Sequence, residues 1–196
     1  RDTDRSRGLG DVYKRQEIGE QAFFNCRNLV SINLEGVRII GDSAFTYCDV
    51  LASVNIVSSV YEIEGYAFKS CPKLNSITFE EGIEIIGTQA FSNTSYGGIT
   101  TLQLPNSLKK IGDSAFSGHQ YLQSIKMSDN IEYIGSKLFN YDNNTSHSIF
   151  IYGDYINPKW DSSFNQASGG VVNTYFYSET YKEGTWHYQD GNALLW

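Results

Sequence analysis

The apolar positions of this chain return at a nearly fixed interval, and each return opens with the same short block. The block reads Ile-Gly-x-x-Ala-Phe, and successive copies start 22 to 25 residues apart. Its six starts, the third in variant form, are Ile18, Ile40, Ile63, Ile86, Ile111 and Ile134. A fixed period in the twenties predicts a solenoid, in which each unit buries its apolar face against its neighbours.

Two local patterns recur inside each unit. Residues 31–34 and 124–127 alternate polar and apolar side chains, which is typical of a strand buried on one face. Residues 41–45 and 112–116 read Gly-Asp-Ser-Ala-Phe, which suggests a short helical turn. The sequence therefore predicts an α/β repeat solenoid with short parallel strands and short helical turns. It covers residues 17–153 in six units, the last of them degenerate.

Equivalent slots in successive units should project parallel side chains. We therefore expect the aromatic slot to form a buried ladder, made by Phe45, Phe68, Phe91 and Phe116. A second slot holds the three cysteines, Cys26, Cys48 and Cys71. A disulfide or a metal site would need these side chains to converge, whereas parallel projection keeps them apart, so we predict buried free thiols.

The two ends of the chain lack the repeat. Residues 1–16 are polar and charged, and residues 11–16 look like the translation of a sequencing adaptor of the kind that contaminates metagenomic reads. A disordered leader is the alternative. Residues 154–196 are rich in aromatic side chains, and the pattern predicts a final strand over residues 171–177. An open solenoid end exposes strand edges, so this segment is predicted to be a C-terminal aromatic β cap, with a carbohydrate platform as the alternative.

Composition narrows the classes of partner. The 196 residues carry 15 basic and 22 acidic side chains, for a formal net charge of −7. Such a surface repels phosphate backbones, which argues against nucleic-acid binding. No apolar run approaches the ~18 residues of a membrane-spanning helix, so no membrane insertion is expected in this stretch.

Catalytic chemistry finds little support in the sequence. The three histidines, His119, His147 and His187, do not stand beside a nucleophile and an orienting acid in a recognisable motif. Phosphate-binding loops and the ligand spacing of zinc or calcium sites are also missing. We therefore expect no catalytic residue, no metal site and no cofactor.

The outward positions of the predicted strands form the candidate ligand-binding surface. They are short, polar and mostly uncharged, which suits a hydrogen-bonding ribbon for a protein or a glycan. The alternative is an ordinary solvated sheet face. These ten residues, called the strand face below, are Ser31, Asn33, Ser53, Asn55, Ser76, Thr78, Thr101, Gln103, Ser124 and Lys126.

Leu29, Ile32 and Leu34, followed by the Ile-Gly-x-x-Ala-Phe-x-x-Cys block, resemble the BspA-like class of leucine-rich repeats, found widely on bacterial surfaces. The resemblance covers residues 18 to about 153. It implies a right-handed superhelix acting as a non-enzymatic adhesion module of a secreted or cell-surface protein. The alternative is a carbohydrate-binding or spacer module of a larger surface-anchored enzyme. Since unit one starts with no rung or cap before it, the chain is expected to be an N-terminally truncated fragment.

Overall fold

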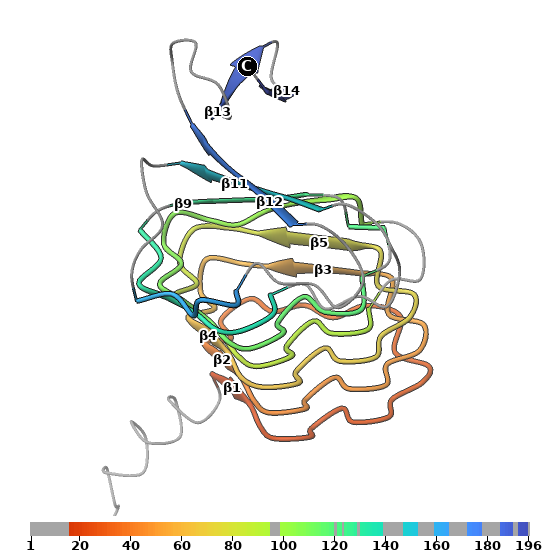
Figure 1. Ribbon diagram of the computed structural model, residues 1–196. Coiled ribbons are helices and arrows are strands. Elements are labelled where there is room, and N and C mark those ends of the chain that lie inside the picture. Colours follow the sequence, from red (N-terminus) through yellow and green to blue (C-terminus); the bar gives the residue numbers. More distant parts are fainter. Residues whose placement is uncertain are drawn as a thin grey trace, which may run out of the picture.

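The chain winds into a stack of similar turns, as the computed structural model in Figure 1 shows. We call each turn a rung and number the rungs one to six by their block isoleucines. The structure describes residues 16–94, 99–119, 121–122, 124–128, 130–138, 147–152, 159–164, 172–177, 185–189 and 192–195. The predicted leader therefore lies, apart from Gln16, outside the described residues.

The block isoleucines form a continuous parallel sheet along one side of the stack. Each rung contributes a strand of two residues, and the register places each isoleucine beside that of the next rung, beginning with Ile18 beside Ile40. In spatial order the strands are β1 (Glu17–Ile18), β2 (Ile39–Ile40), β4 (Glu62–Ile63), β6 (Ile85–Ile86), β8 (Lys110–Ile111) and β10 (Tyr133–Ile134). The predicted period is confirmed.

The longer strands form two separate sheets on another side of the stack. One sheet pairs β3 (Ser53–Ile56) with β5 (Ser76–Phe79). The other contains, in spatial order, β7 (Thr101–Gln103), β9 (Ser124–Ser128), β11 (His147–Tyr152), β12 (Val172–Tyr177), β13 (Thr185–Gln189) and β14 (Asn192–Leu195). All pairs are parallel except the antiparallel pair of β13 and β14. β5 and β7 are not paired, although every residue of both strands is described.

The predicted helical turns are not helices in this structure, because neighbouring rungs take up alternate N–H groups. Phe45 N donates to Ala67 O of the next rung at 2.7 Å, and Ser43 N donates to Gly65 O at 2.9 Å. The residue between them, Ala44, donates to Gly41 O, three residues back. An α-helix would need these N–H groups for its own carbonyls four residues back. The described residues therefore form a parallel-strand β-solenoid without helices, in place of the expected α/β solenoid.

The aromatic slot forms the predicted ladder at the centre of the core. The rings of Phe45, Phe68, Phe91 and Phe116 are fully buried and nearly parallel, with neighbouring centroids 5.0 to 5.7 Å apart. Phe23 extends the ladder into rung one, 5.1 Å from Phe45. The in-phase stacking inferred from the repeat is confirmed.

Rung one is less buried than the rungs that follow it. Ile18 and Phe23 are half-buried, whereas their equivalents Ile40 and Phe45 are fully buried. The strand predicted over residues 31–34 is also absent: these residues pair with no described strand. Rung one has a described neighbour on only one side. It therefore makes fewer of the side-chain contacts and backbone hydrogen bonds that order a strand.

Two aromatic residues from the predicted capping segment belong to the core. Trp160 and Phe164 are buried, with ring centroids 5.3 Å apart. Trp160 Nε1 donates to Ile131 O at 2.7 Å, and Leu138 N donates to Phe164 O at 2.9 Å. Residues 159–164 therefore cover the core at the level of rung six. Much of residues 154–196 lies outside the described part of the chain.

Candidate ligand-binding face

The register gathers most of the strand face into aligned rows. Asn55 lies beside Thr78 across β3 and β5, and Gln103 lies beside Lys126 across β7 and β9. On β3 and β5 the outward residues are exposed while their neighbours in sequence point into the core. Eight of the ten residues are exposed, while Ser124 and Lys126 are half-buried. Ser31 and Asn33 are exposed but belong to no strand.

Hydrogen bonds link this surface from rung to rung. The Thr78 hydroxyl donates to Asn55 Oδ1 at 2.7 Å, and Asn55 Nδ2 donates to Glu80 Oε1 at 3.1 Å. Across the other sheet, the Thr101 and Ser124 hydroxyls share a hydrogen bond of 3.1 Å. Part of the strand face is thus a polar hydrogen-bond network, which restricts the motion of these side chains.

Two glutamates that the sequence reasoning missed hold the turns beside this surface. The Glu80 carboxylate accepts the backbone N–H of Ser58 in rung two at 2.9 Å. The Glu81 carboxylate points the other way and accepts the N–H groups of Asn106 and Ser107 in rung four, at 3.0 and 2.8 Å. These backbone hydrogen bonds lower the pKa of both carboxyls, so both stay ionised. The signal available in the sequence was a Glu-Glu pair directly after a predicted strand.

Proline removes one of the hydrogen bonds that the strand ladder would need between rungs three and four. Between rungs two and three, Glu80 N donates to Ile56 O at 2.8 Å. The repeat places Pro105 at the position of Glu80 in rung four, and proline has no N–H to donate. The Phe79 carbonyl, equivalent to that of Ile56, therefore receives no N–H from this position.

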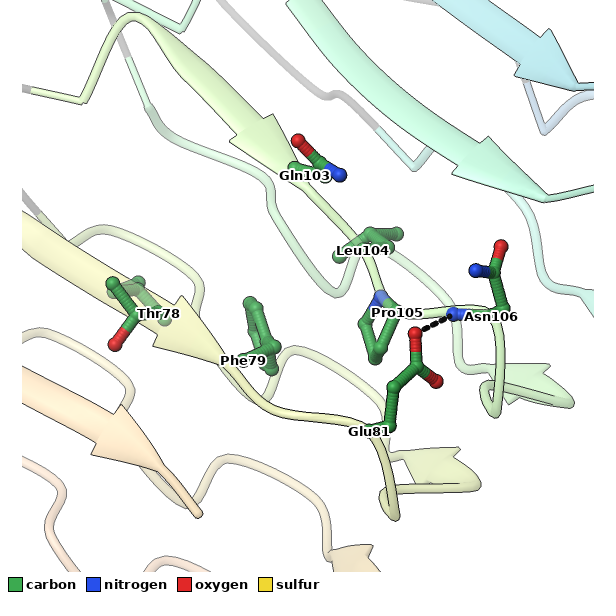
Figure 2. A pocket seen from close by; sticks show the side chains of 8 residues that line it. Thr78, Phe79, Glu81, Gln103, Leu104, Pro105 and Asn106 are labelled. Atoms are coloured by element: carbon green, nitrogen blue, oxygen red, sulfur yellow. Dashed lines mark hydrogen bonds between the residues drawn. The ribbon is translucent and has the colours of Figure 1, made fainter. Parts of the chain in front are cut away.

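A groove of about 530 Å³ lies at this interruption. Figure 2 shows the side chains that line it. It combines apolar side chains with hydroxyl, amide and carboxylate groups. The residues that line it are Ile77, Thr78, Phe79, Glu81, Gln103, Leu104, Pro105 and Asn106. Two predicted strand-face residues, Thr78 and Gln103, are among them, so the groove lies on the surface that the sequence singled out.

The buried cysteines form hydrogen bonds to the backbone of the preceding rung. The Cys48 and Cys71 thiols are free and fully buried, and they donate to the carbonyls of Phe23 and Phe45 at 3.4 and 3.1 Å. Cys26 is only half-buried, contrary to the prediction, because it belongs to the less covered rung one. Within the described residues, no cluster of three or more potential ligands could hold a metal ion.

In rung five, His119 occupies the position that cysteine occupies in rungs one to three. His119 Nε2 lies 2.6 Å from the Phe91 carbonyl, which can only accept, so Nε2 carries the hydrogen. Nδ1 is then an acceptor, and it has no partner among the described residues. Burial lowers the pKa of His119 to about 4. This imidazole is held inside the core, away from any substrate on the surface. The side chains of His147 and His187 lie outside the described residues.

We expect the thiols to differ in reactivity according to their place in the ladder. The neighbouring Cys48 thiol and burial both raise the pKa of the Cys71 thiol, which disfavours the reactive thiolate. Cys71 should therefore react with a maleimide at least about tenfold more slowly than Cys26 in the folded protein. Timed alkylation followed by peptide mass spectrometry measures both rates. Equal reaction rates, or a disulfide between any two of the three cysteines, would contradict the parallel, separately buried arrangement of these thiols.

The chain is similar to one protein family and to solved structures. The family model of the BspA-type leucine-rich repeat region matches residues 13–101 and 95–168, in six copies. A crystal structure of a leucine-rich repeat protein from Bacteroides ovatus ATCC 8483 is 22% identical, covers 83% of this chain and 59% of that chain, and has a TM-score of 0.39. A leucine-rich cell surface protein from Faecalibacterium prausnitzii A2-165 is 24% identical over 64% of this chain and 48% of that chain, with a TM-score of 0.31.

The chain spans only about half to three fifths of the length of these two proteins. No curated protein matches it. Over the described residues, nothing forms a helix with the length and hydrophobicity that crossing a bilayer requires.

Proposed function

Because this chain belongs to the BspA-type leucine-rich repeat family, we propose that it is a non-enzymatic interaction module of a secreted or cell-surface protein. Protein or glycan ligands bind on the strand face. The surface location and the adhesive role rest on the family, whose members are found widely on bacterial surfaces. The acidic net charge of −7 favours ligands other than nucleic acids.

The alignment of short polar side chains across successive rungs is the observation that carries this proposal. Ser53 and Ser76 lie side by side, as do Asn55 and Thr78 one step further along the strands. Neighbouring strands are about 4.8 Å apart, so the surface repeats its donors and acceptors at that spacing. An extended ligand can engage several rungs at once, and the flanking hydrogen bonds reduce the entropy that the side chains lose on binding.

A bulky charged residue in the middle of this surface tests the proposal. Ser76→Arg should weaken binding at least about tenfold, because Ser76 is exposed at the start of β5 and a long side chain would cover its neighbours. The measurement is biolayer interferometry against a panel of matrix glycoproteins and immobilised oligosaccharides.

Asn130→Arg is the matched control, because Asn130 is exposed in the turn between β9 and β10 and gains the same charge. Its binding should equal that of the wild type. The proposal fails if the wild-type protein binds no member of the panel, or if both variants bind as well as the wild type.

A further inference from the structure

We propose that the groove between β5 and β7 binds a neutral sugar unit of a glycan. This inference rests on the proposed function and deepens it, because it selects one place on the strand face and one class of ligand. The groove lies beside Pro105, where β5 and β7 are not paired. Polar groups that form hydrogen bonds between neighbouring strands elsewhere in the stack are therefore open to a ligand here.

The first argument comes from polar groups without a partner. The side-chain amides of Gln103 and Asn106 line the groove, and neither has a hydrogen-bond partner among the described residues. Each amide offers two N–H donors and one carbonyl acceptor. The Phe79 carbonyl adds an acceptor, since the Pro105 position supplies no N–H to it. Sugar hydroxyls both donate and accept, so they can satisfy amides and carbonyls together.

The second argument comes from the apolar part of the groove. Phe79 is half-buried, and its ring meets the edge of Phe91 with centroids 5.8 Å apart. Figure 2 shows Phe79 beside Thr78, with Pro105 on the neighbouring rung. A sugar ring carries C–H groups on its faces, and these pack against aromatic side chains. Pro105 is buried, so Phe79 supplies the accessible apolar surface. A concave apolar surface with a few placed polar groups is the usual composition of a small-molecule site, and 530 Å³ lies within the usual size range.

Two other classes of occupant fit less well. A peptide strand inserted between β5 and β7 would need them about 9.6 Å apart, twice the normal spacing, but their Cα atoms approach within 8 Å. An anionic ligand would meet the ionised carboxylate of Glu81 at the groove and that of Glu80 next to it in sequence, on a chain of net charge −7. A neutral ligand avoids this repulsion, while the Glu81 carboxylate still accepts hydrogen bonds from hydroxyl groups.

The test titrates the whole chain with a panel of neutral tetrasaccharides containing glucose, galactose or xylose, and with a sialylated tetrasaccharide, by calorimetry. At least one neutral member should bind, and the sialylated one should bind at least about tenfold more weakly. Gln103→Ala should weaken binding of the neutral member at least about tenfold, whereas Asn75→Ala should leave it unchanged. Asn75 is an exposed amide just before β5, outside the groove.

A second variant tests the interruption itself. Pro105→Val restores an N–H at the position that Val57 occupies in rung two, so it can bond to the Phe79 carbonyl and close the groove. It should weaken sugar binding at least about tenfold without lowering the thermal midpoint. The same midpoint measurement on Gln103→Ala separates lost binding from lost folding.

The inference is overturned if no neutral tetrasaccharide binds, or if Gln103→Ala and Pro105→Val both bind like the wild type. A preference for the sialylated sugar overturns it as well. The proposed function survives these results if a matrix glycoprotein still binds and Ser76→Arg abolishes that binding. If Ser76→Arg has no effect either, both proposals fall together.

Discussion

Replacing Phe68 with alanine should lower the free energy of unfolding by about 3–5 kcal/mol. Phe68 is fully buried, and its ring lies between those of Phe45 and Phe91, with centroids 5.0 and 5.2 Å away. The cavity can collapse only partly, because backbone hydrogen bonds fix the spacing of the rungs: Phe68 N donates to Ala90 O at 2.7 Å. Truncation therefore loses both the buried surface and the contacts on two faces of the ring.

Urea denaturation followed by circular dichroism measures this loss, with Phe24→Ala as the matched control. Phe24 follows the ladder residue Phe23 in rung one, is 44% exposed, and its ring makes an edge contact with that of Tyr47. Its truncation should cost less than about 1 kcal/mol, as for other exposed side chains. A comparable cost for Phe68→Ala would mean that the rings do not stack in phase.

The protein should lose stability as the pH falls from about 6.5 to about 4, and His119 should account for much of the loss. The pKa of His119 is lowered from 6.5 to about 4 in the folded chain because burial disfavours the imidazolium. Between these values the unfolded chain binds a proton that the folded chain does not. The stabilisation is thus fully present above pH 6.5 and is lost as the pH falls through 4. The loss amounts to about 2 kcal/mol at pH 5 and about 3 kcal/mol below pH 4.

The geometry explains why this histidine resists protonation. Nε2 already bonds to the Phe91 carbonyl, and the Thr94 hydroxyl lies 2.8 Å from the same nitrogen. A proton on Nδ1 would find no acceptor among the described residues. Protonation would therefore bury an unpaired charge, which is costly.

His119→Cys is the control that the repeat itself provides, because cysteine fills this slot in rungs two and three. Urea titrations of both proteins at pH 7, 6 and 5 should diverge as the pH falls, with the wild type losing about 2 kcal/mol more by pH 5. The comparison stops at pH 5, since Glu80, Glu81 and Asp161 also have lowered pKa values and lose their contributions in more acidic solution. Parallel curves for the two proteins would show that His119 is not the sensitive group.

Features fixed by side-chain periodicity could be predicted from the sequence. The isoleucine register, the phenylalanine ladder and the outward rows such as Ser53 beside Ser76 all follow from equivalent slots in equivalent rungs. The conformation of the predicted helical turns could not be read from the sequence, because it depends on whether backbone N–H groups bond within the turn or to the neighbouring rung. Residues such as Ser43 adopt a positive φ of 55° and direct their N–H to the next rung, and no local side-chain pattern reports that choice.

The groove shows a different limit. Pro105 was visible in the sequence, but its effect depends on which carbonyl would have received its N–H. That carbonyl belongs to Phe79, in another rung. The missing hydrogen bond could therefore be identified only once the register of the strands was known. The roles of Glu80 and Glu81 are similar, because each bonds to a turn 22 to 26 residues away.

The missing ladder between β5 and β7 also bears on the mechanics of the whole rod. The isoleucine sheet continues without a gap from rung one to rung six. On the side of the longer strands, the described residues lack strand pairing at the joint between β5 and β7, and also at rung one, where residues 31–34 form no strand. At the joint, Glu81 and the Ser107 hydroxyl, which bonds to Gly82 N and Ile83 O, join the neighbouring turns. A rod fastened continuously along one edge and only by side chains at one point of the other bends most easily at that point. The joint is therefore where an applied load should open the solenoid, with the isoleucine sheet as the axis of the bend.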